Sequence, residues 1–123
     1  MTVPATLLAP LDSIPEGAAR GVTVVQDGGK RELILVRRGG RIYAYVNACP
    51  HLGTPLETFP DKFLDYTGRR LLCSTHGASF RIEDGHCLRG PCAGRSLVRV
   101  AVKVEAGAVV LAGAIAPVPQ PMA

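Results

Sequence analysis

The sequence predicts an all-β protein, and three observations lead to this fold class. Valine, leucine, isoleucine and alanine dominate an apolar fraction of 47%, whereas aromatic residues make up only 5% of the 123 residues and tryptophan is absent. Such branched aliphatic side chains pack well on pleated sheets. Short β-branched runs alternate with glycine turns, and no segment has a sustained 3.6-residue apolar period with helix caps. A chain of this length has room for one domain with a modest core.

The expected strands are short and are separated by turn residues. In chain order they cover residues 22–25, 33–36, 42–46, 79–82, 86–88, 97–104 and 109–111. The clearest hairpin joins the second and third of these through Gly39 and Gly40, because two glycines between apolar runs favour a tight turn. The segment 97–104 alternates apolar with other residues, as in a half-buried strand. The proline-rich end of the chain cannot join a regular ladder.

Charge and the ends of the chain exclude several classes of protein. The formal net charge is +4, but the basic residues are scattered among acids, which is typical of a solvated surface and not of a nucleic-acid footprint. The first ten residues have no basic segment and contain two prolines, which predicts a cytoplasmic protein without a signal peptide. No apolar run approaches the roughly 20 residues that cross a bilayer. Four cysteines in such a chain indicate metal or redox chemistry.

Two short segments each offer one thiol and one imidazole. Cys49 and His51 form a C-x-H pair, and Cys73 and His76 form a C-x-x-H pair. Each pair is followed by a glycine, which permits a tight turn and lets backbone N–H groups approach the sulfurs. Together they supply two thiolates and two imidazoles, a set that fits tetrahedral zinc or a 2Fe-2S centre with histidines on one iron. Zinc is less favoured because its usual sites pair C-x₂₋₄-C with H-x₃₋₅-H.

The paired segments resemble the two cluster-binding loops of the Rieske iron-sulfur family. The resemblance implies a fold of stacked antiparallel sheets with a small cluster-binding subdomain formed by two loops. It also implies a Rieske-type 2Fe-2S cluster in which Cys49 and Cys73 hold the inner iron, and His51 and His76 the outer iron. A third loop, 90–92, is then expected to shield the cluster. The predicted organisation is one domain over 1–116, with the cluster-binding region at about 47–93, and a tail at 117–123.

The sequence also departs from the pattern of that family. Between His51 and Cys73 lie 21 residues, 52 to 72, which implies an enlarged outer loop. Relatives of high potential carry an additional cysteine in each loop, where this chain has Thr54 and Thr75, so a disulfide between the loops is not expected.

Two hydroxyl groups that face the cluster in those relatives are also missing. Ala78 and Phe80 stand where those relatives place a serine and a tyrosine whose hydroxyls face the cluster. Losing those donors makes the reduced state less favourable, which predicts a low potential.

The remaining aromatic and cysteine residues are given modest roles. The enlarged loop contains Phe59, Phe63 and Tyr66, half of the six aromatic residues, and local packing beside the cluster is favoured over a docking surface for a partner. Cys87 and Cys92 stand five residues apart and can approach each other across a turn, but reduced, partly buried thiols are favoured over a disulfide in a cytoplasmic protein.

The resemblance implies a carrier of single electrons and not an enzyme. A Rieske-type oxygenase adds an iron held by two histidines and a carboxylate, and with three histidines in the chain only His86 is left for such a site. No catalytic residue and no small-molecule substrate is therefore predicted. The expected role is a Rieske-type ferredoxin that relays electrons from a flavin reductase to an oxygenase or similar acceptor. The alternatives are the small Rieske-like subunit of an assimilatory nitrite reductase and a structural zinc module that binds other proteins.

Overall fold

The computed structural model describes residues 6–26, 29–50, 53–57, 59, 61–74 and 77–118. The predicted all-β class is confirmed, since this part of the chain contains short strands and a single 3₁₀ turn. The elements are β1 (Leu7–Pro10), η1 (Leu11–Ser13), β2 (Ala19–Gln26), β3 (Gly29–Arg38), β4 (Arg41–Val46), β5 (Arg70–Leu72), β6 (Ser79–Arg81), β7 (Cys87–Arg89), β8 (Val102–Glu105) and β9 (Ala108–Leu111).

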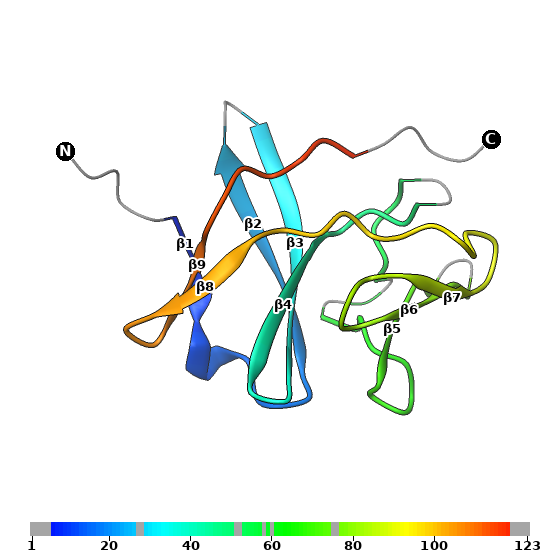
Figure 1. Ribbon diagram of the computed structural model, residues 1–123, viewed down its shortest axis with the longest axis horizontal. Helices are drawn as coiled ribbons and strands as arrows, with labels where there is room; N and C mark the ends of the chain where they lie inside the picture. Colours follow the sequence, from blue (N-terminus) through cyan, green and yellow to red (C-terminus); the bar gives the residue numbers. More distant parts are fainter. Residues whose placement is uncertain are drawn as a thin grey trace.

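The strands form three antiparallel sheets of three strands each within the described residues. The central sheet has the order β2-β3-β4. It lies between the sheet β1-β9-β8, on the left of Figure 1, and the small sheet β5-β6-β7, on the right. The predicted hairpin is present: β3 and β4 pair from Leu33↔Val46 to Arg38↔Arg41 across the two-glycine turn. The small sheet and its loops contain the region predicted to bind a cluster.

Strand β3 is buried on both faces, which makes the central sheet the partition between two cores. Leu33, Ile34, Leu35 and Val36 are all completely buried. Because successive side chains of a strand point to opposite faces, Ile34 and Val36 join the core shared with the small sheet, and Leu33 and Leu35 join the core shared with β1 and β9. One strand therefore holds the region predicted to bind a cluster against the rest of the protein.

Some expected strand boundaries were wrong, and two strands were not expected. A strand was predicted over 97–104, but strand β8 begins only at Val102, so residues 97–101 lie outside it. They cross the end of β4 instead, where the Val46 N–H donates to the Val98 carbonyl at 2.9 Å and Tyr45 and Arg99 form an isolated bridge. The alternation of apolar residues in this segment reflects burial of Leu97 and Val100, which needs no continuous ladder. Strands β1 and β5 were not expected from their short apolar runs.

A buried tyrosine connects the central sheet to the small sheet. Tyr45 on β4 is fully buried, and its hydroxyl donates a hydrogen bond to the carbonyl of Ile82 just after β6. Gly85 lies directly against the ring: a Cβ at this position would stand 2.6 Å from Tyr45 Cε1. Glycine also suits the backbone here, because its φ is +74°. The turn after β6 is thereby held against β4.

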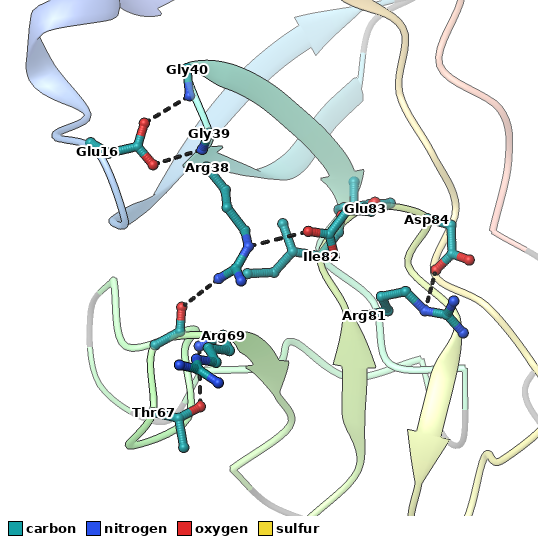
Figure 2. A network of polar contacts seen from close by, with 12 residues as sticks. Glu16, Arg38, Gly39, Gly40, Thr67, Arg69, Arg81, Ile82, Glu83 and Asp84 are labelled. Carbon is teal, nitrogen blue, oxygen red and sulfur yellow. Dashed lines mark hydrogen bonds and ion pairs between the residues drawn. The ribbon is translucent and has the colours of Figure 1, made fainter.

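Polar contacts close the same junction at the surface, as Figure 2 shows. The Arg38 side chain reaches from the end of β3 to Glu83, at 3.2 Å between Nε and Oε2, and to the Gly68 carbonyl at 3.5 Å. The carboxylate of Glu16 accepts hydrogen bonds from the N–H groups of Gly39 and Gly40 at 2.7 and 2.8 Å. These exposed contacts orient the β3–β4 turn and contribute little stability individually.

Among the described residues, no helix has the length and hydropathy that crossing a lipid bilayer requires.

Candidate metal centre

The first predicted ligand segment forms a tight six-residue loop, residues 49–54, which we call the first loop. The Cys49 N–H donates to the Thr54 carbonyl at 2.7 Å, and the Gly53 N–H donates back to the Cys49 carbonyl at 2.6 Å. Gly53 has a φ of +76°, a left-handed conformation that suits glycine. The cysteine therefore stands at the base of a closed loop.

The second predicted segment forms a loop of the same size and bonding, residues 73–78, which we call the second loop. The Cys73 N–H donates to the Ala78 carbonyl at 2.8 Å, and the Gly77 N–H donates to the Cys73 carbonyl at 2.8 Å. Gly77 has a φ of +73°, within a few degrees of its counterpart in the first loop. The described residues of the two loops therefore have the same backbone bonds, each with a cysteine at the first position and a left-handed glycine at the fifth.

Both loop cysteines are completely buried and belong to one core cluster. Cys49 and Cys73 are 0% exposed and share that cluster with Phe80 and Cys92. The segments are also connected through the backbone, since the Ser74 N–H donates to the Leu56 carbonyl at 2.9 Å. The fold thus places one buried sulfur in each of two adjoining loops. The other two predicted ligands, His51 and His76, lie outside the described residues.

A buried asparagine anchors the chain on both sides of the first loop. Asn47 is only 7% exposed. Its Oδ1 accepts a hydrogen bond from the Leu56 N–H at 2.8 Å, and its Nδ2 donates to Glu57 at 2.8 Å. We did not single out this residue from the sequence. The only signal for it was a polar residue directly after the apolar strand and two positions before the predicted ligand Cys49.

The third loop packs directly on the second. A Cβ on Gly90 would lie 2.7 Å from Ala78 Cα, so only glycine permits this approach. Two residues further, Cys92 is completely buried, and its side chain interacts with Cys49 and with Cys87. Burial raises the pKa of the Cys92 thiol, and the two neighbouring sulfurs raise it further. The third loop therefore packs against the second loop, and its role in shielding a cluster stays a prediction.

The enlarged segment has a mixed character. Phe63 is completely buried and lies against Gly21, where a Cβ would stand 3.1 Å from the ring. Asp61 supports the same contact by accepting a hydrogen bond from the Gly21 N–H at 2.8 Å. Local packing was therefore the right expectation for Phe63. It was wrong for Phe59 and Tyr66, which are 68% and 101% exposed.

A basic groove borders the second and third loops. Arg69, Arg70 and Arg89 line it together with Gly77 and Gly90. All three arginines are exposed. In the part of the chain that the structure describes, no acidic side chain forms an ion pair with any of them. The surface next to the loops is therefore positively charged.

One acid at the edge of this groove remains ionised. Asp65 is partly buried, which raises its pKa, but hydrogen bonds from the hydroxyl and the N–H of Thr67, at 2.6 and 3.1 Å, outweigh this effect and lower the pKa overall. The three arginines still outnumber this carboxylate.

His86 has a local structural role. Its N–H donates to the Asp84 carboxylate at 2.9 Å, and its Nδ1 lies 3.3 Å from the Ser96 hydroxyl. These contacts belong to the turn before β7. They hold His86 within this turn.

The donor set fits an iron-sulfur centre. Two buried sulfurs on two glycine-containing loops suit a centre of two bridged irons, because each loop presents one cysteine from its base. The surrounding core is apolar, and its members Leu56, Leu71 and Phe80 are completely buried, which limits access of water. Two such cysteine loops in a small all-β protein are typical of the class of domains that hold an inorganic iron-sulfur cluster.

Comparison with known proteins agrees with this class. A family model described as the Rieske (2Fe-2S) domain matches residues 5–112, so the chain belongs to the Rieske family. Proteins of this family bind a 2Fe-2S cluster. A comparison with curated protein sequences finds no match.

Solved structures with the same fold include two ferredoxins of similar length. The ferredoxin of carbazole 1,9a-dioxygenase from Nocardioides aromaticivorans IC177 is 23% identical, with a TM-score of 0.68 over 89% of this chain and 98% of that one. The Sphingomonas yanoikuyae B1 ferredoxin is 22% identical, with a TM-score of 0.69 over 90% and 100%. A putative small subunit of an NADPH nitrite reductase is 18% identical, with a TM-score of 0.63 over 90% and 100%. At these identities the similarity establishes the fold alone.

Proposed function

We propose that this protein is a Rieske-type ferredoxin whose cluster is held by Cys49, His51, Cys73 and His76. The observation that carries the proposal is the duplication of the two loops around two buried cysteines in one core. In this assignment the thiolates hold the inner iron and the imidazoles hold the outer iron. When bound, the 2Fe-2S cluster takes up and releases one electron.

The chain contributes rigidity, a dry environment and few hydrogen-bond donors. The cross-loop backbone bonds keep the two cysteines in place, so little rearrangement accompanies electron transfer. Ala78 and Phe80 are both completely buried, and neither has a hydroxyl group to donate to a ligand sulfur. Since such donors stabilise the reduced, more negative state, their absence at these two positions supports a low reduction potential.

The partners we propose are redox proteins: a flavin reductase as donor and an oxygenase or similar acceptor. Two of the similar structures are ferredoxins, one of them named for a dioxygenase. Membership in a nitrite reductase complex is the second candidate, because a putative small subunit of that enzyme has the same fold over its whole length. Purification distinguishes them, since a ferredoxin is isolated alone and a subunit co-purifies with a large flavin or haem protein.

Iron analysis and EPR spectroscopy test the proposed cluster. Anaerobically purified protein should contain about two irons and two acid-labile sulfides per chain. After reduction with dithionite, the average g-value should lie below that of a 2Fe-2S centre with four cysteines, because two nitrogen ligands replace sulfur on one iron. Stoichiometric zinc in a colourless protein would select the structural zinc module instead. Iron with the g-values of an all-cysteine centre would reject the two histidines as ligands.

The basic groove is the docking surface that we assign to an acidic partner. Reversing two of its charges in the double variant Arg70→Glu/Arg89→Glu should slow the oxidation of reduced protein by hexacyanoferrate(III) about tenfold at low ionic strength. The same variant should accelerate oxidation by hexaamminecobalt(III). Stopped-flow spectroscopy measures both rates, and about 1 M salt should remove the difference because it screens charge beyond roughly 3 Å.

A matched control separates this local effect from net charge. Lys103→Glu reverses one charge on β8, in the sheet on the other side of the central sheet from the loops (Figure 1). It should change either oxidation rate less than about twofold, because β8 lies away from the groove. The exposed ion pair with Glu105 that it breaks contributes little to stability, so the variant should stay folded. The single variants Arg70→Glu and Arg89→Glu, which carry the same charge change, should each exceed it. An equal effect at β8 would show that the groove has no special role in docking.

A further inference from the structure

Two cysteines outside the proposed ligand set touch each other in the core. Cys87 Sγ and Cys92 Sγ are 3.2 Å apart, and the two residues are 2% and 0% exposed. Neither forms a disulfide bond. Apolar side chains pack with heavy atoms about 3.5–4.0 Å apart, so this separation is shorter than that of two cysteines acting only as apolar filler. The two sulfurs form a hydrogen-bonded dithiol.

The two hydrogen bonds of the pair form a chain in which Cys92 donates to Cys87, and Cys87 donates to a backbone carbonyl. The Cys87 thiol donates to the Arg89 carbonyl at 3.2 Å, so its sulfur remains available as an acceptor. The Cys92 thiol donates to that sulfur. It also interacts with Cys49 at the base of the first loop. Cys92 therefore lies between a second thiol and a proposed ligand sulfur.

The backbone around the pair suits a local cross-link. Cys87 lies on β7 and Cys92 lies five residues later, after the turn that contains Gly90. Forming a disulfide requires the sulfurs to approach from 3.2 Å to about 2.05 Å. Residues 93–96, which directly follow Cys92, are exposed, so a small reagent reaches the buried pair when this turn opens locally.

We propose that Cys87 and Cys92 are a site of reversible oxidation at which an intramolecular disulfide forms beside the cluster. The oxidant is a low-molecular-weight disulfide. During local opening, one protein thiol loses its proton to water, attacks the S–S bond of the oxidant and releases one small thiol. The second protein thiol then loses its proton, attacks the mixed disulfide and releases the other small thiol. Two protons and two electrons leave the protein pair, and the small disulfide becomes two thiols.

The proposal has a consequence for electron transfer, and this part alone rests on the proposed function. Cys92 has a single S–H hydrogen, which it donates to Cys87 in this structure. When Cys49 is a cluster-bound thiolate, which is a stronger acceptor than a thiol, we expect that hydrogen to turn to the Cys49 sulfur, which also interacts with Cys92. Such a donor stabilises the reduced cluster. The disulfide has no S–H group, so its formation should shift the reduction potential of the cluster to a more negative value. The ratio of thiols to disulfides in the surroundings would then change the reduction potential of the cluster.

Peptide mapping after oxidation tests the site directly. Protein equilibrated in glutathione buffers of increasing disulfide content should lose two of its four thiols, counted after denaturation. Cleavage after arginine then yields the peptides 82–89 and 90–95, joined and lighter by two hydrogens than their sum. Dithiothreitol should restore all four thiols. A pair that stays reduced even in pure glutathione disulfide, or a link to Cys49 or Cys73, would overturn the proposal.

Two variants connect the site to the cluster. Cys87→Ser prevents the disulfide but keeps the Cys92 thiol, so its cluster potential should equal that of the reduced wild type and should not respond to oxidant. Cys92→Ala removes the donor and should have the more negative potential permanently. If the linked peptide forms while the potential is unchanged, the predicted hydrogen bond to Cys49 is wrong. Because the linked peptide is detected without iron, a failure of the cluster assignment is recognised separately.

Discussion

Replacing Cys73 with serine should abolish the iron-sulfur cluster and reduce bound iron at least about tenfold. Cys73 is buried at the base of the second loop, where two backbone hydrogen bonds hold it in place. A serine hydroxyl is a poor ligand for iron that prefers thiolate. Losing the centre also removes a folding constraint from both loops, so the variant should unfold more readily. Visible absorbance, iron content and thermal unfolding measure these effects.

The matched control is Cys87→Ser, which makes the same chemical change at a second buried cysteine. Cys87 is 2% exposed and donates to the Arg89 carbonyl, a bond that a serine hydroxyl can retain. This variant should keep full iron content and colour. Comparable loss of iron from both variants would indicate that buried cysteines in this core are needed for folding in general, and would remove the support for Cys73 as a specific ligand.

Gly90→Ala should lower the free energy of unfolding by about 2–4 kcal/mol and make the cluster more sensitive to air. The added Cβ would lie 2.7 Å from Ala78 Cα and 3.1 Å from the Ala78 nitrogen, which are backbone atoms that cannot rotate away. The φ of +103° adds strain for any residue with a Cβ. The third loop must therefore move off the second loop and uncover the site. Anaerobic denaturation and the bleaching rate in air measure the two effects.

Gly94→Ala isolates the steric part of that result. Gly94 has a similar φ of +90°, but a Cβ added to it would meet no atom within 4 Å. Its substitution should cost only the backbone strain, about 1–2 kcal/mol, and should leave the bleaching rate unchanged. If the two variants behave alike, the contact between Gly90 and Ala78 does not protect the cluster.

The two tight turns at Cys49 and Cys73 could be predicted from the sequence because their information is local. In each segment a cysteine, a histidine and a glycine lie within five positions. The glycine favours a tight turn, and the other two residues are possible metal ligands, so both segments were recognised without knowledge of the fold. The β3–β4 hairpin was predicted for the same reason, since two glycines between apolar runs determine the turn. Its observed register, from Leu33↔Val46 to Arg38↔Arg41, follows from that turn.

Other features depend on segments that are distant in the sequence. The apolar run at 33–36 indicates a buried strand, but only the positions of the two flanking sheets show that it separates two cores. Residues 97–101 alternate like a strand, yet they cross β4 without joining a ladder, because burial produces the same pattern with or without one. Leu71 on β5 is buried, although the sequence predicts that it lies in an outer loop.

The sequence by itself determined the fold class, the two loop motifs and the chemistry of their donors, because short-range spacing and side-chain type are sufficient for these. Only the tertiary structure decided that Cys92 meets both Cys87 and Cys49, that Gly90 packs on Ala78, and that three arginines from two separate segments line one groove. These contacts arise from how the third loop and the small sheet pack together, and packing depends on the shapes of surfaces that no local pattern specifies.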